Sequence, residues 1–224
     1  MIVPHHVVII PDGNRRWAKQ KNHPSLYGHR EGYTRIKELI SYAKEKEIKF
    51  LTVWAFSTEN WKRKEDEVGD IFGLVKKGLS EIHSIAKKEK TKVIHIGRRD
   101  RIEKSLLKLM EQVEEETKQY KNFCLCLAID YGGEDEIKRA EKKLQKSGNK
   151  NKSIIDFLDT TFHNVPKPDL IIRTGGEKRT SGFMPLQSCY SEYIFSDLLF
   201  PDFAIQEFEK VLDEYRKRDR RFGK

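Results

Sequence analysis

Short apolar runs alternate along the chain with longer amphipathic segments. The apolar runs are Val7–Ile10, Leu51–Phe56, Val93–Ile96, Phe123–Ile129 and Leu170–Ile172. Each is short enough to be a buried strand. Apolar residues recur at helical spacing in Gly28–Lys46, Glu65–Glu89, Arg101–Thr117, Glu136–Leu144 and Ile205–Tyr215. Alternating strands and helices predict an α/β fold with a mostly parallel central sheet flanked by helices. We expect residues 1–224 to form a single domain, with Gln145–Lys152 as a surface loop.

The predicted helix Glu65–Glu89 carries a broad apolar face that is interrupted by glycine. The face consists of Val68, Ile71, Phe72, Val75, Leu79, Ile82 and Ala86. At about 100° per residue, Gly78 lies near the edge of this face and Gly73 on the opposite side. Each glycine costs the helix about 1 kcal/mol relative to alanine. The simplest interpretation is a helix packed on a core.

Polar residues follow three of the predicted strands. Asp12, Ser57 and Arg173 come at or just beyond the ends of apolar runs. Because the carboxyl ends of parallel strands form one edge of a sheet, where ligands bind, we expect the three to meet there.

The first strand end, Asp12-Gly-Asn-Arg-Arg16, has the richest chemistry. Gly13 and Asn14 allow a tight turn with exposed N–H groups, and Arg15 and Arg16 add cationic donors. A carboxylate that can hold Mg²⁺ beside such donors suits a diphosphate ligand. An ordinary strand–turn–helix junction is the alternative.

Net charge is +9, which could indicate nucleic acid, an anionic membrane surface or a phosphorylated substrate. The basic residues are interleaved with acidic residues, which favours solvated helix faces over a continuous basic surface for nucleic acid, so no nucleic-acid partner is expected.

Three cysteines give no even disulfide framework and are typical of a reducing compartment. No apolar run approaches the ~18 residues of a spanning helix, and Asp12 interrupts the N-terminal run, so no signal peptide is predicted. We expect a cytoplasmic protein with at most transient membrane contact.

Three separated motifs in this order resemble the cis-prenyltransferases of the undecaprenyl diphosphate synthase family. They are His6–Ala18, Phe56-Ser-Thr-Glu-Asn-Trp61, and Leu170–Ser181 followed by Gln187–Glu192. The resemblance runs from about His5 to the Arg-Arg-Phe-Gly ending at Gly223. It implies a homodimeric, Mg²⁺-dependent transferase that condenses isopentenyl diphosphate with an allylic diphosphate to form a new Z double bond. It also implies that helix Glu65–Glu89 lines an elongated hydrophobic tunnel for the growing chain.

The same resemblance assigns roles to individual residues. It makes Asp12 the catalytic carboxylate and Mg²⁺ ligand, and it involves Asn60 in proton removal through a phosphate oxygen or water. Glu192 matches the position that completes the Mg²⁺ site, from the same chain or a partner subunit. The allylic diphosphate set is Gly13, Asn14, Arg15, Arg16, Trp17 and His29. The wall between the sites comprises Ser57, Thr58, Glu59, Trp61 and Arg63. The isopentenyl diphosphate set is Arg173, Arg179, Thr180 and Ser181.

Several of these residues also have ordinary structural interpretations. Arg15 and Arg16 could be surface charges, Trp17 and Trp61 interior aromatics, and Glu192 a surface carboxylate. Four positions depart from the usual family pattern, namely Pro11, Ser25, Glu134 and Leu186. We expect Ser25 to weaken the allylic phosphate cradle.

Two other functions are compatible with parts of the sequence. One is a non-catalytic partner subunit on the same fold, but Asp12, Ser57 and Asn60 are all present, which argues against it. The other is a basic module that binds RNA or another polyanion. A trans-type prenyl synthase is excluded because the chain has no Asp-Asp pair.

Overall fold

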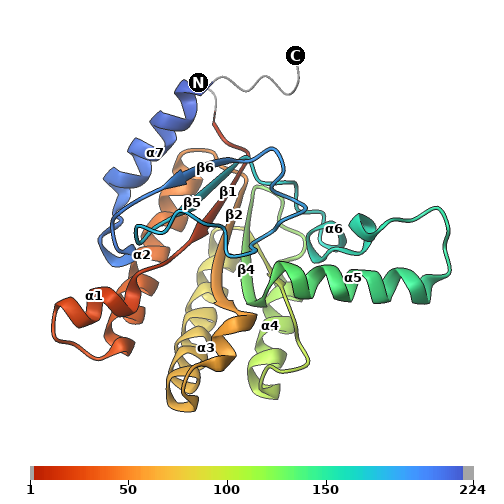
Figure 1. Ribbon diagram of the computed structural model, residues 1–224, viewed down its shortest axis with the longest axis horizontal. Coiled ribbons are helices and arrows are strands. Elements are labelled where there is room, and N and C mark those ends of the chain that lie inside the picture. Colours follow the sequence, from red (N-terminus) through yellow and green to blue (C-terminus); the bar gives the residue numbers. More distant parts are fainter. Residues whose placement is uncertain (1–2, 219–224) are drawn as a thin grey trace.

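A six-stranded parallel sheet forms the centre of the computed structural model, which describes residues 3–218. The strands are β1 (His6–Ile10), β2 (Phe50–Ser57), β3 (Thr91–Ile96), β4 (Phe123–Tyr131), β5 (Leu170–Arg173) and β6 (Glu192–Phe195). Their order across the sheet is β3-β4-β2-β1-β5-β6 (Figure 1). The predicted α/β class and parallel sheet are confirmed. The Arg-Arg-Phe-Gly segment, at which the resemblance to the family ends, lies outside the described residues.

Five of the α-helices in the described residues fall close to the predicted segments, whereas those at Asn14–Gln20 and Asp159–Phe162 were not predicted. The α-helices are α1 (Asn14–Gln20), α2 (Ser25–Glu45), α3 (Glu65–Lys88), α4 (Lys104–Thr117), α5 (Gly133–Ser147), α6 (Asp159–Phe162) and α7 (Ile205–Lys217). Short 3-10 helices form η1 (Thr58–Lys62), η2 (Ile154–Phe157) and η3 (Phe200–Asp202). Helix α3 begins with three acidic residues and ends with two lysines, the charge order that complements a helix dipole. No described helix is long and apolar enough to cross a bilayer.

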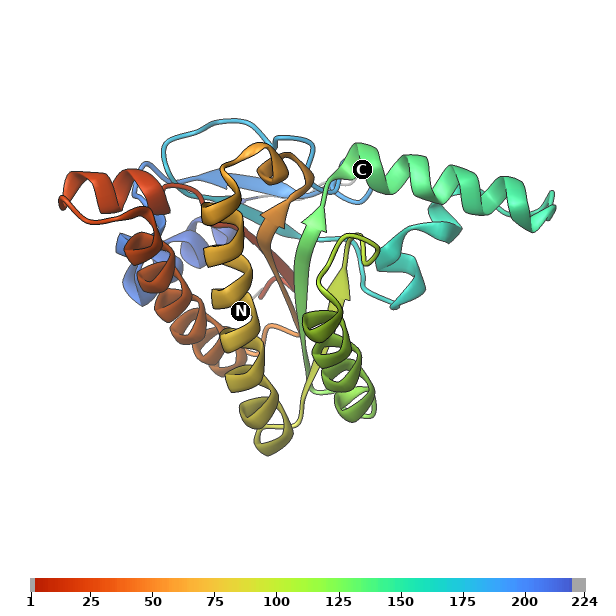
Figure 2. The ribbon, with the colours of Figure 1, turned by 90° about the horizontal axis from the view of Figure 1, so that it is seen from below.

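The two faces of the sheet are covered differently. Alternate strand residues such as Val7 and Leu51 join the buried faces of α2, α3, α4 and α7 in the larger core cluster. On the other face, strand residues such as Val8 pack with Phe183 and Met184 from the loop between β5 and β6. Helix α5 leaves the end of β4 and extends away from the body of the molecule (Figure 2). Helices therefore cover one face, whereas the second core cluster consists mainly of strand residues covered in part by this loop.

Helix α3 has the predicted orientation, with Val68, Ile71 and Leu79 buried. Gly78 is buried and Gly73 is exposed, as the sequence pattern predicted. A Cβ atom at Gly73 would meet no atom within 4 Å, whereas one at Gly78 would lie 2.7 Å from the Cε2 atom of Tyr33 on α2. Gly78 is therefore required for the close approach of α2 and α3.

Alanine substitutions at these two glycines should have opposite effects on stability. We expect Gly73→Ala to raise the free energy of unfolding by about 1 kcal/mol, because it improves helix propensity in open space. Gly78→Ala gains the same propensity but should lower the free energy of unfolding by about 1 kcal/mol, because the methyl group displaces the Tyr33 ring. Urea unfolding measures both values. Equal stabilisation by the two substitutions would contradict this packing.

Candidate active site

The carboxyl ends of β2, β1 and β5 form one wall of a large polar cavity, because these strands are neighbours in the sheet. Its volume is about 940 Å³. Predicted site residues that line it are Asp12, Gly13, Asn14, Arg15, Arg16, His29, Ser57, Glu59, Asn60, Arg63, Arg173 and Ser181. The expected meeting of the three strand ends is confirmed. Pro11 and Ser25, two of the positions that differ from the usual family pattern, also line this cavity.

Asp12 lies between two arginines at this edge. One carboxylate oxygen, Oδ2, accepts from the Arg173 guanidinium at 2.8 Å, and Oδ1 accepts from Arg16 at 3.2 Å. The Asp12 carbonyl accepts from the Thr174 hydroxyl at 2.8 Å. The side chain of Asp12 is 32% exposed, whereas that of Arg173 is only 6% exposed. Asp12 is thus held in place from the protein side and remains open to the cavity.

Glycine at position 13 permits the turn that follows. Its φ is 108°, in the left-handed region, and a Cβ atom there would lie 2.8 Å from Leu199. Helix α1 starts at the next residue, and Arg15 and Arg16 on its first turn are exposed. Trp17 points elsewhere, since its indole donates to Asp202 at 2.7 Å and stacks on Tyr27. Trp17 anchors α1 and does not line the polar cavity.

The segment after β2 is fixed by a capping box. The Ser57 N–H donates to the Asn60 side-chain oxygen at 3.0 Å, and the Ser57 side chain caps η1 in return. The Asn60 amide oxygen is therefore occupied by the Ser57 N–H, and Asn60 lines the cavity. Trp61 donates to Asp130 at 2.9 Å and packs on the core, so it is an interior aromatic. Thr58 donates to Glu59 at 2.7 Å, outside the cavity lining.

Besides Arg173 Nε, three buried polar atoms in the cavity wall have no hydrogen-bond partner in the described structure. They are Asn14 Oδ1, Ser25 Oγ and His29 Nε2. Burial, together with the positive charge of Arg63, lowers the pKa of His29 to about 4. His29 is therefore neutral at pH 7. Because buried polar groups normally have partners, these three atoms indicate a polar ligand.

Acidic side chains pair with the cavity arginines. Glu67 on α3 lies 3.0 Å from Arg63 and 3.5 Å from Arg15. Glu177 pairs with Arg179 and lies 3.9 Å from Arg16. Guanidinium groups from three segments therefore bind carboxylates at or beside the cavity, and a phosphate offers the same kind of hydrogen-bond acceptor.

Comparison with known proteins connects this geometry with a family. Residues 10–223 match the family model described as "Putative undecaprenyl diphosphate synthase". The chain belongs to this family. It is 44% identical to the isoprenyl transferase of Aquifex pyrophilus, over 99% of this chain and 96% of that protein. It is 38% identical to the tritrans,polycis-undecaprenyl-diphosphate synthase (geranylgeranyl-diphosphate specific) of Pyrococcus abyssi, over 100% of this chain and 88% of that protein.

Solved structures agree with the family assignment. Lavandulyl diphosphate synthase from Lavandula x intermedia, in complex with dimethylallyl diphosphate, is 31% identical with a TM-score of 0.94, and the match covers 99% of both chains. A probable undecaprenyl diphosphate synthase from Campylobacter jejuni is 34% identical with a TM-score of 0.84, over 100% of both chains. The chain is therefore a cis-type isoprenyl diphosphate synthase, an enzyme family that joins allylic and isopentenyl diphosphates.

In this family member, Arg173 also organises the loop that follows β5. Its guanidinium donates to the Arg179 carbonyl at 2.5 Å and to the Ser181 hydroxyl at 2.8 Å. The Arg179 side chain itself is 62% exposed and, with Thr180, lies outside the cavity lining. The structure thus brings Arg173 and Ser181 to the cavity and leaves Arg179 at the surface beside it.

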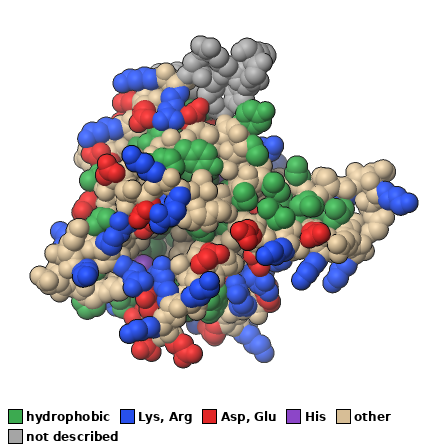
Figure 3. All heavy atoms as spheres, in the orientation of Figure 1, with side chains coloured by type: hydrophobic (Ala, Val, Ile, Leu, Met, Phe, Trp, Pro, Cys, Tyr) green, Lys and Arg blue, Asp and Glu red, His purple; other side chains and the backbone are tan. Residues whose placement is uncertain are grey.

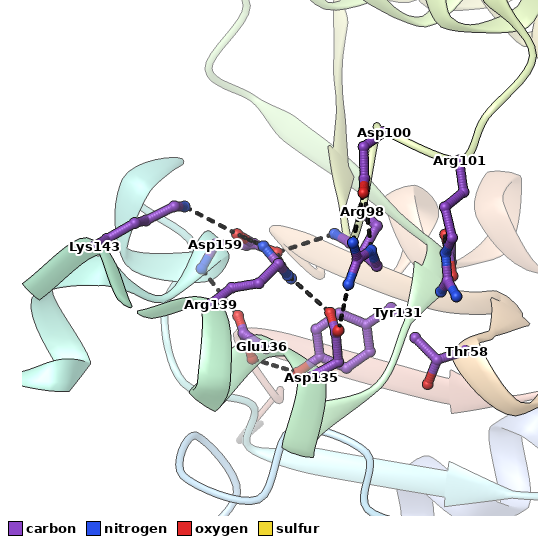
Figure 4. A network of polar contacts seen from close by, with 12 residues as sticks. Thr58, Arg98, Asp100, Arg101, Tyr131, Asp135, Glu136, Arg139, Lys143 and Asp159 are labelled. Atoms are coloured by element: carbon purple, nitrogen blue, oxygen red, sulfur yellow. Dashed lines mark hydrogen bonds and ion pairs between the residues drawn. The ribbon is translucent and has the colours of Figure 1, made fainter. Parts of the chain in front are cut away.

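A buried polar network that the sequence analysis missed supports the same loop. Glu136 is 1% exposed and accepts from the Tyr131 hydroxyl at 2.5 Å, the Gln187 amide at 2.9 Å and the Asp159 N–H at 2.9 Å. Burial raises the pKa of the Glu136 carboxyl. Figure 4 shows Glu136 beside Tyr131, with Arg139 directed toward Asp159. The acidic run at the start of α5 resembles a solvated helix terminus, so nothing in the sequence marked Glu136 as buried.

Glu192 lies at the opposite edge of the sheet from Asp12 within one chain. Glu192 begins β6 and pairs with Leu170, the first residue of β5. Asp12 comes two residues after Ile10, which pairs with Arg173 at the last residue of β5. Arg218 donates to the Glu192 carboxylate at 2.6 Å. Among residues 3–218, no three His, Cys, Asp or Glu side chains are grouped as a metal site.

A second, apolar cavity of about 100 Å³ lies between α2, α3 and the sheet. It shares Pro11, Asn14, His29, Ala55 and Ile71 with the polar cavity. Deeper residues of its wall include Ile36, Leu79 and Ile82. The buried face of α3 is therefore both core and cavity wall.

Replacing Glu136 should loosen the loop between β5 and β6. Glu136→Ala removes the acceptor of three buried donors, of which the Gln187 amide keeps a second acceptor in the Thr160 hydroxyl, at a cost of about 2–4 kcal/mol. We expect faster amide hydrogen exchange in residues 180–188 of the folded variant. Glu134→Ala is the matched control, since the Glu134 side chain on the same helical turn is 90% exposed. Equal exchange in the two variants would show that the network does not anchor the loop.

Proposed function

We propose that this enzyme condenses isopentenyl diphosphate with an allylic prenyl diphosphate to give a Z-configured polyprenyl diphosphate, with Mg²⁺ as its cofactor. The observation that carries the proposal is the ion-paired Asp12, which lines a polar cavity that shares wall residues with an apolar cavity. A prenyl diphosphate has the same two parts, a charged head and a hydrocarbon tail. The family membership supports the reaction class.

The allylic diphosphate is expected over the first turn of α1. Arg15, Arg16 and Arg63 can bind phosphate oxygens in place of their present carboxylate partners. Neutral His29 and the unpartnered atoms of Asn14 and Ser25 provide polar contacts without further charge. Isopentenyl diphosphate is expected on the other side of Asp12, where Arg173 and Ser181 line the cavity and Arg179 lies at its rim.

Asp12 fits Mg²⁺, which in proteins is commonly held by one or two carboxylates together with substrate phosphates. Its carboxylate is partly exposed and its two arginine neighbours would also contact the phosphates. When bound, the ion would neutralise charge on the departing diphosphate. We propose that Glu192 contributes to this site only from a second copy of the chain, because within one chain it lies at the opposite sheet edge. That supports a homodimer.

The reaction breaks the allylic C–O bond, whose electron pair leaves with diphosphate. The terminal alkene carbon of isopentenyl diphosphate, C4, forms the new C–C bond, and positive charge develops on C3. C2 then loses a proton, and the electrons of that C–H bond form the new C2–C3 double bond. Ser57 holds the Asn60 amide oxygen, so Asn60 offers N–H donors and can orient the phosphate oxygen or water that takes this proton. The cluster of arginines stabilises the negative leaving group, and the apolar cavity keeps water from the cation-like carbon.

Neither alternative function gains support from the structure. A non-catalytic subunit would not need Asp12, Ser57 and Asn60 arranged around one cavity. A polyanion-binding module predicts a basic surface, whereas Figure 3 shows basic and acidic side chains interspersed over the visible face. We further propose a cytoplasmic enzyme that contacts membrane transiently, because a long polyprenyl product is apolar.

The direct test is incubation of the purified protein with labelled isopentenyl diphosphate, farnesyl diphosphate and Mg²⁺. Chromatography of the products and NMR of the new double bonds measure elongation and configuration.

EDTA should stop turnover and Mg²⁺ should restore it, whereas Zn²⁺ should substitute poorly for Mg²⁺ at a site with oxygen ligands. Asp12→Ala should reduce turnover by several orders of magnitude, because it removes charge stabilisation worth several kcal/mol. Asp70→Ala, at an exposed position on α3, is the control.

A turnover of Asp12→Ala within about tenfold of the parent would remove Asp12 from the catalytic role. Full activity in excess chelator would contradict the metal assignment. Products with E double bonds would contradict the stereochemistry without affecting the reaction class.

The division into two diphosphate sites has its own test. Arg179→Ala should raise the KM for isopentenyl diphosphate about thirtyfold, through loss of charge-assisted hydrogen bonds worth on the order of 2 kcal/mol. The KM for the allylic substrate should change much less. Lys178→Ala replaces an exposed neighbouring cation and controls for net charge. Equal rises for both substrates would show that the division is wrong.

A further inference from the structure

Asp130 lies near the end of β4 and is fully buried, at 0% exposed. It is outside the described lining of both cavities, so its carboxylate does not contact a ligand held there. Its backbone has a φ of 50°, in the left-handed region that aspartate tolerates better than most residues. A carboxylate shielded from water needs hydrogen-bond donors in the protein, and those of Asp130 come from two other segments.

Asp130, Trp61 and Arg101 form a closed set of three contacts. The Trp61 indole N–H donates to the Oδ1 atom of Asp130 at 2.9 Å. Arg101 donates to both carboxylate oxygens, with its Nε atom 2.9 Å from Oδ2. The Arg101 guanidinium also lies 5.4 Å from the centre of the Trp61 ring, in a cation–π contact. Figure 4 shows Arg101 reaching from the loop after β3 toward the end of β4. Each of the three side chains therefore holds the other two.

Trp61 belongs to η1, the short helix beside which polar residues of the candidate site lie. Asn60 precedes Trp61 and Arg63 follows two residues later, and both line the polar cavity. The Trp61 ring instead packs on the main core between β2 and α3, with its centre 5.4 Å from that of Phe56 and 5.2 Å from that of Phe72. The position of this one ring therefore sets the position of its two neighbours at the cavity.

Two further contacts fix the beginning of η1. The capping box joins Ser57 to Asn60. A Cβ atom at Gly132, two residues after Asp130, would lie 2.2 Å from the Oγ1 atom of Thr58, so the backbone after β4 lies directly against η1. The start of η1 is thus held by its cap and by Gly132, whereas its end is held through Trp61.

We propose that Asp130 is a positioning residue of this enzyme, which holds η1 through Trp61 so that Asn60 and Arg63 are presented to the polar cavity. The inference rests on the proposed function, in which Arg63 binds the allylic diphosphate and Asn60 orients the group that takes the proton. Arg101 balances the charge of the buried carboxylate. An anchor inside the protein therefore sets two groups at the cavity.

The anchor matters because η1 supplies little rigidity of its own. It is a 3-10 helix of five residues, and the hydrogen bonds of such helices have poorer geometry than those of α-helices. A misplacement of about 1 Å at a reacting group can reduce turnover by roughly 100-fold. The contacts with β4 therefore bear directly on the reaction.

The experiment measures kcat and the KM for farnesyl diphosphate, with isopentenyl diphosphate and Mg²⁺, in the parent and in Asp130→Ala. We expect Asp130→Ala to raise this KM about tenfold and to lower kcat by a similar factor, because Arg63 and Asn60 lose their fixed positions. Loss of folded protein alone would lower the apparent kcat and leave KM unchanged. Asp130→Asn keeps an oxygen acceptor for Trp61, so its values should lie between those of the parent and Asp130→Ala.

The Arg63→Ala background separates positioning from general damage. Once Arg63 is removed, Asp130→Ala should raise the KM for farnesyl diphosphate by less than about twofold, because the group that it positions is absent. An equal rise in both backgrounds would overturn the inference.

Asp100→Asn is the matched control. Asp100 lies in the same loop as Arg101, but its carboxylate is 61% exposed and pairs with Arg98. We expect Asp100→Asn to leave both kinetic constants unchanged. Amide hydrogen exchange in residues 58–63 gives a second measurement that needs no turnover. It should be faster in Asp130→Ala and in Trp61→Phe, which lacks the indole donor, and unchanged in Asp100→Asn.

Unchanged kinetic constants in folded Asp130→Ala would overturn the inference, and so would unchanged exchange in residues 58–63. If Asp130→Ala does not fold, Asp130→Asn and Trp61→Phe are judged by the same criteria. A parent enzyme that makes no prenyl product would contradict the proposed function. Because exchange reports the anchoring of η1 without turnover, that failure is distinguishable from a failure of the inference.

Discussion

The ion pair between Asp12 and Arg173 is the interaction on which the candidate site depends. Arg173 ends β5 in register with the last residue of β1, so its side chain emerges beside Asp12 at the sheet edge. The guanidinium is almost fully buried, and a buried charge needs partners to offset its lost hydration. Asp12 on one side and the loop residues Arg179 and Ser181 on the other accept hydrogen bonds from its two terminal nitrogens. One buried cation therefore positions the carboxylate and the loop together.

The second constraint is the junction between polar and apolar space. Asn14 and His29 border both cavities, and His29 is kept neutral by burial and by a nearby arginine. The junction therefore provides hydrogen-bonding groups. It does not place a charged group against the hydrocarbon part of a ligand. Charge is confined to the arginines and acids at the open side. This separation matches a ligand with a charged head and an apolar tail.

The loop between β5 and β6 depends on residues far from it in the sequence. Its Gln187 side chain binds Glu136 at the start of α5, and Phe183 packs on Trp54 of β2 with ring centres 4.6 Å apart. The backbone N–H of Gly133 also donates to the Gly182 carbonyl at 3.1 Å. These contacts fix the loop from the sheet side, while Arg173 fixes it from the cavity side. The loop covers part of the core and presents Ser181 at the cavity, so packing and ligand binding depend on the same segment.

The sequence alone determined the fold class, the order of most strands and helices, and the meeting of Asp12, Ser57 and Arg173, because local hydrophobic periodicity and the rule for parallel strand ends are sufficient for these. It also placed Gly78 on the inner face of α3 and Gly73 outside, since a helical wheel needs only residue spacing. The tertiary structure decided which residues share a buried partner. The sequence did not mark Glu136 or Tyr33 for a particular partner, because burial and pairing depend on residues more than 40 positions away. It likewise directed Trp17 and Trp61 into the protein, since an indole N–H must find an acceptor wherever packing brings one within reach.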